Sequence, residues 1–278
     1  ANPVNEVQAF VSALHIQDSE RVACPTCSPT RKKWNAKEMV VTRLDHAWVY
    51  HCHHCGENGS VFFDKPKLVE RKLSAVPNPT ITQNTLQEPH YQYLKTRGIS
   101  KETADKMKLF ATCKYFSRLN RETQAIGFPY YRNGALTSAK YRSIEEKDFT
   151  QDVGGAHDFF CIDLVDVKQP IVIVEGEIDA LTGMECGIPN VISVPSGAPI
   201  KVADGKVSAS EDKKFSFVWN AFEILNKAPY IIIATDNDSP GQALAEELSR
   251  RIGKHRCRLT SMTAKDLNDV FLTSGADS

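Results

Sequence analysis

The sequence predicts an α/β protein in which an open, parallel sheet follows a small cysteine-rich module. Two observations predict this class. The apolar runs 171–174 and 231–234 each break into carboxylates and glycine and are followed by a helical segment, which is the pattern of buried parallel strands with acidic side chains at their carboxyl ends. Residues 1–63 contain two Cys-x-x-Cys pairs. We therefore expect a metal-binding module, a linker, and a sheet that carries the chemistry.

The length and composition allow about two domains with a small third one. The chain has 278 residues, of which 41% are hydrophobic. It has no apolar run of about 18 residues that could span a membrane, and its first residues do not resemble a signal peptide, so we expect an intracellular protein. Residues 90–149 hold 12 Lys and Arg against 6 Asp and Glu, whereas residues 168–278 hold 12 against 15. A basic segment therefore precedes an acidic one.

Four cysteines form the expected metal site. Cys24 and Cys27 make one Cys-x-x-Cys turn, and Cys52 and Cys55 make another after 24 intervening residues. Two such pairs of thiolates complete a tetrahedral zinc site, and inside a cell they indicate metal rather than disulfides. A nearby histidine could replace one cysteine. These alternative ligands are His51, His53 and His54.

Segments 38–43 and 47–51 alternate like the paired strands of a zinc ribbon. Aromatic and polar side chains on these strands and their turn could stack on and hydrogen-bond single-stranded bases. For Trp48 and Tyr50, packing in the small core of the ribbon is the alternative. The Arg-Lys-Lys segment 31–33 is either a phosphate-contacting loop or a solvated one. The candidate template-binding residues are Arg43, His46, Trp48 and Tyr50.

Residues 64–88 contain three prolines and little hydrophobic periodicity, which predicts a flexible linker. Residues 89–167 form an expected basic subdomain of mixed α+β structure. Its second helix has Ser100 as the N-cap, and Gly98 ends the helix before it. The expected elements are helices over 91–97 and 100–109 and strands over 125–131 and 136–142, joined by an Arg-Asn-Gly-Ala turn.

Cations gather at the end of that subdomain. Lys140 and Arg142 stand two residues apart on a predicted strand and so point to one face, and Lys147 lies in the loop beyond. An arginine can bind two phosphate oxygens at once and the lysines act as point charges, so this group could hold a triphosphate. A solvent-facing basic strand is the alternative.

Carboxylates follow both apolar runs of the C-terminal part, residues 168–278. Glu175 follows the first run, and Asp236 and Asp238 follow the second. Carboxylates that meet at one sheet edge repel one another unless a divalent cation such as Mg²⁺ or Mn²⁺ neutralises them. Asp179 falls on the first turn of the helix after Glu175, where a carboxylate can stabilise the helix.

Two helices are expected behind these strands, over 178–186 and 239–252. The second should have Ser239 as its N-cap, Pro240 at its first position and Gly253 at its end. A Pro-Ser-Gly-Ala-Pro turn at 195–199 follows a further short strand. It could approach a phosphate with its backbone or simply turn the chain.

Three ordered motifs resemble those of the Toprim domain, which is shared by bacterial-type primases, type IA and type II topoisomerases and some nucleases. They span roughly residues 168–272. The motifs are Glu175-Gly-Glu-Ile-Asp179-Ala, Asp236-Asn-Asp238-x-x-Gly241 and Lys265-Asp-Leu-Asn-Asp269. With Tyr93-Leu-Lys-x-Arg-Gly-Ile-Ser, Lys140-x-Arg142 and a zinc module ahead of them, the chain resembles the primase part of the phage bifunctional primase-helicases, relatives of mitochondrial Twinkle and of bacterial replicative primases.

The resemblance implies a DNA primase that makes short RNA primers de novo on single-stranded DNA. It implies a structural Zn²⁺ in a ribbon that recognises template, and two Mg²⁺ or Mn²⁺ ions at the sheet edge. The implied partners are template, ribonucleoside triphosphates, a hexameric helicase domain outside this chain and a replicative DNA polymerase that accepts the primer. The implied location is a phage-infected or prophage-bearing host cytoplasm, or a mitochondrion. The implied catalytic residues are Glu175, Asp236, Asp238, Lys140, Arg142 and Lys147. The resemblance also puts Glu177 and Asp179 in the acidic patch as further candidate metal ligands, with a structural role in its helix as the alternative for Asp179.

A different class of function stays open. A zinc module beside a Toprim domain also occurs in recombination mediators of the RecR type, which bind DNA without catalysis. A primase remnant that serves only as an appendage of a helicase is a further alternative. A topoisomerase would need a catalytic tyrosine in an additional domain, for which the chain is too short.

Overall fold

The computed structural model describes residues 6–44, 47–62, 81, 83–152, 154–203 and 212–276. The chain forms two compact units, residues 1–69 and 70–278, and each is described by itself. The predicted linker falls mainly on residues 63–80 and 82, which lie outside the described residues. From residue 83 the chain is again described, and the backbone of Asn84 pairs with that of Ala111.

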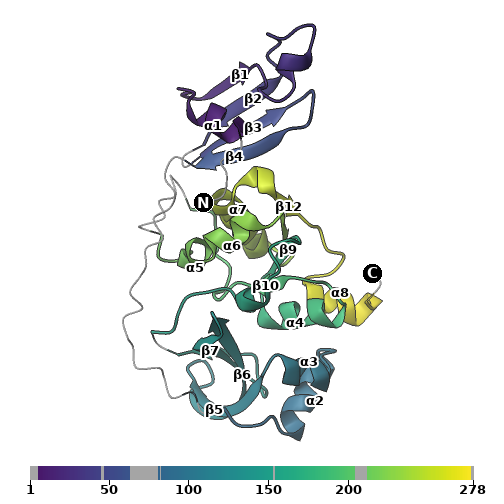
Figure 1. Cartoon of the computed structure of the whole chain (residues 1–278). Coiled ribbons are helices and arrows are strands. Elements are labelled where there is room, and N and C mark those ends of the chain that lie inside the picture. The colour runs from purple at the N-terminus through teal and green to yellow at the C-terminus, as the bar shows by residue number, and fades with distance from the viewer. Residues whose placement is uncertain are drawn as a thin grey trace. The chain divides into compact units, whose positions relative to one another are not determined.

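The N-terminal unit is a four-stranded antiparallel sheet with one helix (Figure 1). Both predicted strands are present, and two further strands that the sequence pattern did not indicate extend the sheet on either side. Strand order along the sheet is β1-β2-β3-β4. The elements are α1 Glu6–Ser12, β1 Ser19–Val22, the 3-10 turn η1 Ser28–Thr30, β2 Met39–Arg43, β3 Ala47–Cys52 and β4 Asn58–Phe62.

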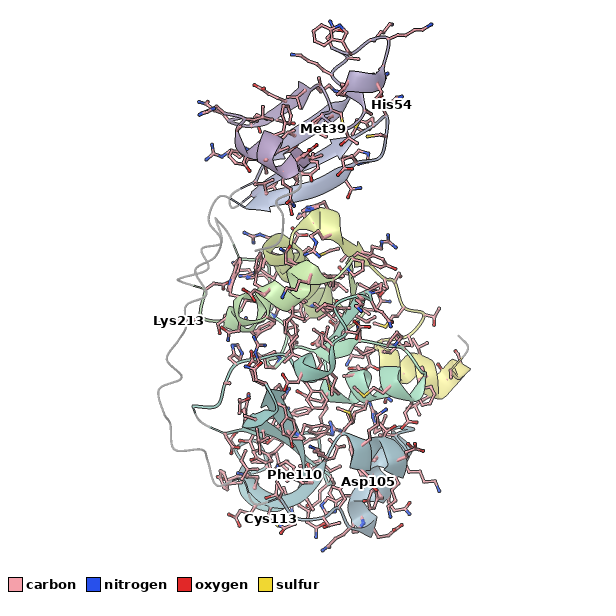
Figure 2. All side chains as sticks on the ribbon, viewed as in Figure 1. Met39, His54, Asp105, Phe110, Cys113 and Lys213 are labelled. Atoms are coloured by element: carbon pink, nitrogen blue, oxygen red, sulfur yellow. The ribbon has the colours of Figure 1, made fainter. Side chains whose placement is uncertain are left out.

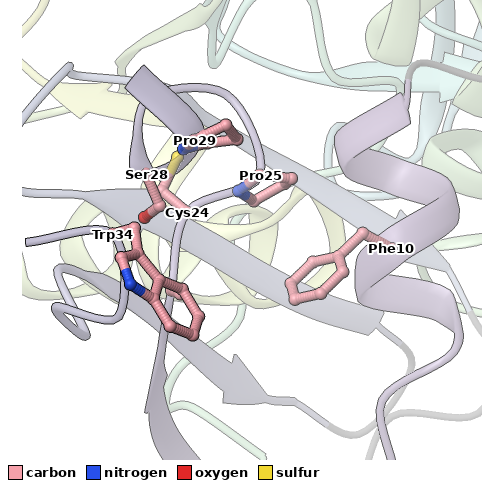
Figure 3. Close-up of a pocket in the computed structure, with 7 residues that line it drawn as sticks. Phe10, Cys24, Pro25, Ser28, Pro29 and Trp34 are labelled. Atoms are coloured by element: carbon pink, nitrogen blue, oxygen red, sulfur yellow. The ribbon is translucent and has the colours of Figure 1, made fainter. Parts of the chain in front are cut away.

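The core of this unit is small and includes its cysteines. Met39 and Val41 of β2 are fully buried, and Val7 and Val11 of α1 belong to the same hydrophobic cluster. A separate apolar pocket of about 370 Å³ opens at the surface beside Cys24 (Figure 3). Its lining residues are Phe10, Ala23, Cys24, Pro25, Ser28, Pro29 and Trp34.

The second unit begins with helices α2 Glu88–Thr96 and α3 Lys101–Lys106. The Ser100 hydroxyl accepts a hydrogen bond from the Thr103 amide at 3.1 Å, which confirms the predicted N-cap. The predicted end of α3 at residue 109 was wrong. Lys108 adopts a left-handed φ of 55°, and this reversal ends the helix early.

An antiparallel sheet of order β5-β6-β7-β8 follows these helices. The predicted hairpin is confirmed, and Asn133 and Gly134 supply the positive φ angles, 52° and 75°, that its tight turn requires. Strands β5 and β8 were not predicted. Figure 2 shows Phe110 in this region, where its side chain is buried, and Cys113, which is exposed. The strands are β5 Phe110–Phe116, β6 Arg121–Arg132, β7 Ala135–Ser143 and β8 Phe149–Gln151.

The C-terminal part is the predicted parallel sheet, with strand order β10-β9-β11-β12. The chain leaves the central strand β9 through α4 to the outer strand β10, and it leaves the central strand β11 through α7 to the outer strand β12. The two connections therefore run in opposite directions. Since such crossovers are right-handed, α4 and α7 cover opposite faces of the sheet. The strands are β9 Ile171–Val174, β10 Val191–Ser193, β11 Ile231–Ala234 and β12 Cys257–Leu259. The helices are α4 Glu177–Glu185, α5 Ser216–Asn220, α6 Phe222–Lys227, α7 Ser239–Ile252 and α8 Leu267–Ser274, with 3-10 turns η2 Ile162–Leu164 and η3 Lys254–Arg256.

One hydrophobic cluster joins the two sheets of the second unit. It includes Phe128 and Tyr130 of β6 together with all four residues of β9. The backbones of Phe160 and Ser193 also pair across the junction. Among the described residues, no helix is both long and apolar enough to cross a bilayer.

Candidate functional site

Two acidic turns lie side by side at the carboxyl edge of the parallel sheet. Strands β9 and β11 are neighbours, and Val174 pairs in register with Ala234. Glu175 and Thr235 therefore leave the sheet at the same level, and Asp236 follows one residue later. Because the crossovers diverge at β9 and β11, this is the switch point of the sheet, where open α/β folds bind ligands.

The carboxyl group of Glu175 is held in an unfavourable environment for its charge. Burial, followed by the negative charges of Asp236 and Asp238, raises its pKa to about 7, against the opposing effect of hydrogen bonds from the backbone amides of Asp236 and Ala198. Its Oε2 atom is buried and has no hydrogen-bond partner in the described part of the chain. A buried, unpartnered carboxylate oxygen facing other carboxylates is what a divalent cation would satisfy.

Asp236 is the centre of this acidic group. Burial, followed by the charge of Asp266, raises its pKa, while Lys265 opposes the shift. The Lys265 ammonium lies 3.6 Å from Asp236 Oδ2, and its own pKa is raised by Asp236. A backbone hydrogen bond also joins the turn after β11 to the segment that carries Lys265, since the Asn237 amide donates to the Lys265 carbonyl at 2.7 Å. Lys265 thus acts as a counter-ion for the acidic side chains at the sheet edge.

Asp238 makes a contact that the sequence did not predict. It is the N-cap of α7, and its Oδ1 accepts a hydrogen bond from the Gly241 amide at 2.9 Å. The predicted cap, Ser239, is instead the first helical residue. Gly253 ends the helix as predicted, with a φ of 109°. Gly241 is needed because a Cβ there would stand 2.0 Å from the carbonyl oxygen of Asp236.

Asp179 is buried behind this edge and holds two helices together. Its Oδ1 accepts a hydrogen bond from the Asn268 amide in the first turn of α8, at 3.1 Å. Burial, with the nearby charge of Asp266, raises its pKa to about 7. Asp179 therefore has a structural contact, but with α8 rather than with the helix on whose first turn it lies, as the sequence had suggested.

Glu177 lies in a different environment from Glu175. Its Oε1 accepts hydrogen bonds from the Tyr130 hydroxyl at 2.5 Å and from Lys140 Nζ at 2.8 Å. Glu177 is 3% exposed and the Lys140 side chain 15% exposed, so this is a buried ion pair. The pair links α4 of the parallel sheet to β6 and β7 of the antiparallel sheet.

Arg142 and Lys140 share one face of β7, as predicted, because both lie over the ring of Phe149, at 5.2 and 5.4 Å. Arg142 also lies 4.9 Å from the Tyr93 ring, so its guanidinium is held between two aromatic side chains. Its pKa is lowered by burial. Lys147 is exposed in the following loop and forms no ion pair with any described residue.

The turn after β10 is fixed by a histidine. The His157 ring lies 2.9 Å from the Ser196 hydroxyl through Nε2 and 2.9 Å from the Ser216 hydroxyl through Nδ1. Two residues beyond Ser196, the Ala198 amide faces the carboxylate of Glu175. The turn at 195–199 therefore borders the acidic edge.

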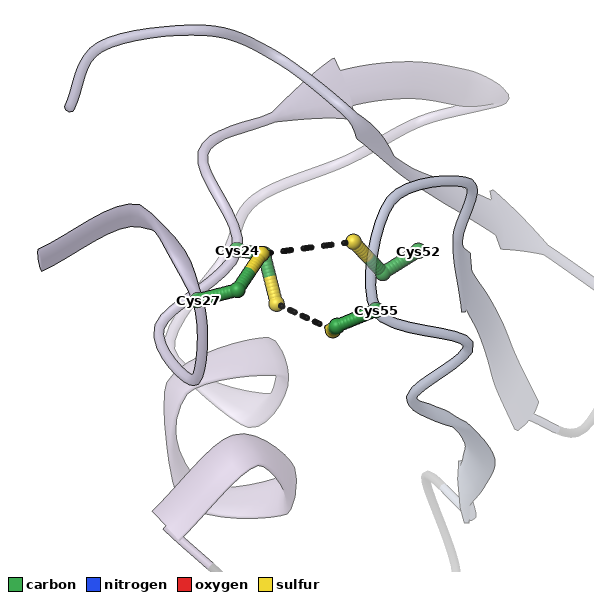
Figure 4. A group of neighbouring side chains, drawn as sticks. All are labelled: Cys24, Cys27, Cys52 and Cys55. Atoms are coloured by element: carbon green, nitrogen blue, oxygen red, sulfur yellow. Dashed lines mark hydrogen bonds between the residues drawn. The ribbon is translucent and has the colours of Figure 1, made fainter. Parts of the chain in front are cut away.

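In the N-terminal unit the four predicted cysteines come together (Figure 4). Their sulfur atoms all lie within 4.8 Å of one another, with Cys24–Cys55 at 3.8 Å and Cys27–Cys52 at 3.7 Å. Zn–S bonds of about 2.3 Å in a tetrahedron require S···S separations of about 3.8 Å. The donor set and its spacing therefore fit zinc. In the part of the chain that the structure describes, the carboxylates form no set of three that is equally tight, so a cation at the sheet edge would have to draw them together.

The candidate template-binding residues of the ribbon are not equally available. Tyr50 is 4% exposed and belongs to the core of the unit, which is the packing alternative. Trp48 is half-buried against the same core, and Arg43 at the end of β2 is exposed. His46 lies outside the described residues.

Sequence reasoning missed four participants in this site. Asp266 and Lys265 were within a quoted motif but had no assigned role. Tyr93 also stood in a quoted motif without an assigned role, and Tyr130 lay in a predicted strand. Each reaches its charged partner only through tertiary packing.

The comparisons with known proteins agree with this geometry. Residues 169–263 match the model of the Toprim domain. The Twinkle homolog protein, chloroplastic/mitochondrial, of Arabidopsis thaliana is 33% identical over 269 residues, covering 91% of this chain and 36% of that protein. The primase homolog protein of the same plant is 37% identical over 215 residues, covering 74% of this chain and 61% of that protein.

A solved structure shows the same fold. The primase fragment of the bacteriophage T7 primase-helicase protein superposes with a TM-score of 0.53 at 22% sequence identity, covering 92% of this chain and 96% of that one. The predicted mixed α/β fold of a zinc-binding module and a Toprim polymerase domain is therefore confirmed. The chain is a homologue of Twinkle proteins, plant primase homologues and phage primase-helicases, and it contains a Toprim domain in the fold of a primase fragment.

Proposed function

We propose that this chain is a DNA primase that synthesises short RNA primers de novo on single-stranded DNA. The observation that carries the proposal is the acidic sheet edge, in which Glu175 and Asp236 have raised pKa values, within a chain whose relatives include a primase homologue. Carboxylates with perturbed pKa values in a Toprim domain are suited to metal-assisted phosphate chemistry.

Glu175, Asp236 and Asp238 would hold the Mg²⁺ or Mn²⁺ ions, with Asp266 close enough to contribute charge. A bound divalent ion supplies a Lewis acid that lowers the pKa of the attacking 3′-hydroxyl and stabilises the released pyrophosphate. Asp238 can keep its cap on α7 through Oδ1 and offer its second oxygen. We assign Glu177 and Asp179 to positioning, because each is already engaged by other protein groups.

Lys140, Arg142 and Lys147 would bind the triphosphate of the incoming ribonucleotide. The two aromatic rings fix the plane of the Arg142 guanidinium before substrate arrives, which reduces the entropy lost on binding. The pair Glu177–Tyr130 positions Lys140. The reaction needs no protein nucleophile, since orientation and electrostatic stabilisation account for most of such catalysis.

Zn²⁺ at the four cysteines is the structural ion of this proposal, and the ribbon would contact template. The chain spans 36% and 61% of the two plant relatives. The T7 relative is a primase-helicase, so the proposal includes a hexameric helicase as a partner and a replicative DNA polymerase as the acceptor of the primer, in a compartment that replicates DNA.

A primer-synthesis assay with labelled ribonucleotides on random single-stranded DNA tests the proposal. Wild-type protein should form short RNA products that depend on template and magnesium. Asp236→Asn should lose at least about 100-fold in rate, because one removed electrostatic group of a reaction centre costs about that much, while template binding stays unchanged. Template binding without any product from the wild-type chain would instead support the non-catalytic alternative.

A further inference from the structure

The apolar pocket of the N-terminal unit has the properties of a binding site (Figure 3). Two rings, those of Phe10 and Trp34, and two prolines, Pro25 and Pro29, dominate its lining. None of its lining residues comes from β2 or β3, the strands that carry Arg43, Trp48 and Tyr50. The pocket is therefore a separate feature from the template-binding residues suggested by the sequence.

Trp34 is the most unusual member of the lining. It is 70% exposed among the described residues, although exposing a large indole to water is unfavourable. The ring stands at the wall of a cavity of about 370 Å³. That volume exceeds what one nucleobase requires, and a planar ligand can stack on an indole from the open side.

Basic residues flank Trp34 in the sequence. Arg31, Lys32 and Lys33 directly precede Trp34, and Lys37 follows it. The three lysines are exposed and have no ion pair with any residue in the described ranges. Arg31 approaches one carboxylate, Glu38, at 3.8 Å. This loop therefore presents an uncompensated positive charge beside an aromatic platform.

The lining also offers a polar contact. The Ser28 side chain is 5% exposed, and its hydroxyl has no hydrogen-bond partner among the described residues. Nη1 of Arg31, which does not line the pocket, is also buried without a hydrogen-bond partner in the described part of the chain. Buried polar atoms without partners are costly, and a ligand edge with a donor or an acceptor would relieve that cost.

We propose that this pocket binds one unpaired base of a single-stranded nucleic acid, which stacks on Trp34 while its flanking phosphates contact Lys32 and Lys33. Aromatic stacking beside a basic groove is the usual means of holding single strands without reading their sequence. An acidic peptide would also suit the charge. The planar base is favoured because both rings and both prolines offer flat apolar surface and the polar contacts are few. The inference depends on the proposed function in one respect, because that function identifies the bound polymer as a single-stranded nucleic acid.

Binding of a fluorescent twelve-residue oligothymidylate to the zinc-loaded full chain tests the proposal, with an abasic oligonucleotide of the same length and charge as the second probe. Trp34→Ala should weaken oligothymidylate binding about tenfold, or about 1.4 kcal/mol. It should leave binding of the abasic oligonucleotide unchanged. Tyr115→Ala, at an aromatic side chain of the other unit that is 52% exposed, is the matched control and should change neither.

The paired change Lys32→Gln and Lys33→Gln should weaken both probes. It should lower the slope of log Kd against log salt by about 1.4, since each phosphate contact on a single strand contributes about 0.7. Equal binding of oligothymidylate by Trp34→Ala and wild type would overturn the proposal, and so would an equal loss with the abasic probe. Displacement of oligothymidylate by an acidic peptide from wild type but not from Trp34→Ala would assign the pocket to protein.

The outcome is separable from that of primer synthesis. Asp236→Asn should bind oligothymidylate as wild type does. If the wild-type chain makes no primer yet Trp34→Ala loses base-dependent binding, the polymerase proposal fails and the pocket stands. If primers form but Trp34→Ala changes the binding of neither probe, only the pocket assignment fails.

Discussion

Glu175→Gln should stabilise the protein in the absence of magnesium, although it removes a residue of the proposed reaction centre. In the folded protein the pKa of Glu175 is raised from 4.5 to about 7. Between these values the folded state holds a proton that the unfolded state has lost, so this carboxyl makes stability fall as pH rises from about 4.5 to 7. Above pH 7 the cost is complete and constant.

The size of the effect follows from the shift. A displacement of about 2.5 pKa units corresponds to about 3 kcal/mol. The side chain is partly exposed, so screening by water reduces the expected value to about 2 kcal/mol. For a unit of residues 70–278, that amount should raise the Tm of the variant by about 4–8 °C at pH 8. At pH 4.5 the two proteins should unfold at nearly the same temperature.

Calorimetry of both proteins at the two pH values, with and without added magnesium, measures this. Magnesium should raise the Tm of the wild type at pH 8 and should raise that of Glu175→Gln much less, because the cation relieves the same repulsion. Glu223→Gln, at an exposed carboxylate on α6, is the control and should behave as wild type. A variant less stable than wild type by the same amount at both pH values would refute the electrostatic account.

Three further changes test other parts of the structure. Lys140→Met should destabilise the protein by about 3 kcal/mol, because it leaves the buried Glu177 carboxylate without its cation. Adding Glu177→Gln to this variant should restore the Tm measured by thermal unfolding, but it should not restore nucleotide binding measured by titration. Cys52→Ser should lower the zinc content measured by metal analysis from one ion per chain and unfold the ribbon, and unchanged zinc would show a different ligand set. Gly241→Ala should cost about 1–3 kcal/mol and lower the primer-synthesis rate, since its Cβ would lie 2.0 Å from a backbone carbonyl oxygen of the acidic turn; Gly197→Ala, which has open space around it, should be nearly neutral in the same assays.

Much of the fold was predictable because its signals are local. Strands β9 and β11 are fully apolar runs that end in acidic turns, and neighbouring parallel strands bring those turns to one edge. Strands β1 and β4 were missed because they are short and largely polar, Ser-Glu-Arg-Val and Asn-Gly-Ser-Val-Phe. They are strands only because β2 and β3 pair with them. The pairing is a tertiary effect that no propensity reports.

The arrangement of the acidic side chains was predictable to a similar extent. The sequence predicted that Glu175 lies beside Asp236, because Glu175 directly follows β9 and Asp236 is the second residue after β11. The partner of Glu177 was not predictable, because Glu177 is the first residue of α4 and the helix turns this side chain towards Lys140 of β7. Asp266 reaches the acidic edge from a segment beyond β12, and only the folded chain shows that its charge raises the pKa of Asp236.

These contacts suggest why the site is stable before substrate binds. The acidic edge is partly neutralised by Lys265, and the basic strand is partly neutralised by Glu177, so each half carries an internal counter-ion. A divalent cation would take the place of Lys265 at Asp236, because the Lys265 side chain is 51% exposed and can turn to solvent. A triphosphate would instead bind the remaining N–H donors of Lys140 while Glu177, which is 3% exposed, keeps its cation, since separating the pair would leave a buried carboxylate unpaired. Arg142 needs no such counter-ion because aromatic rings, rather than a carboxylate, hold it in place.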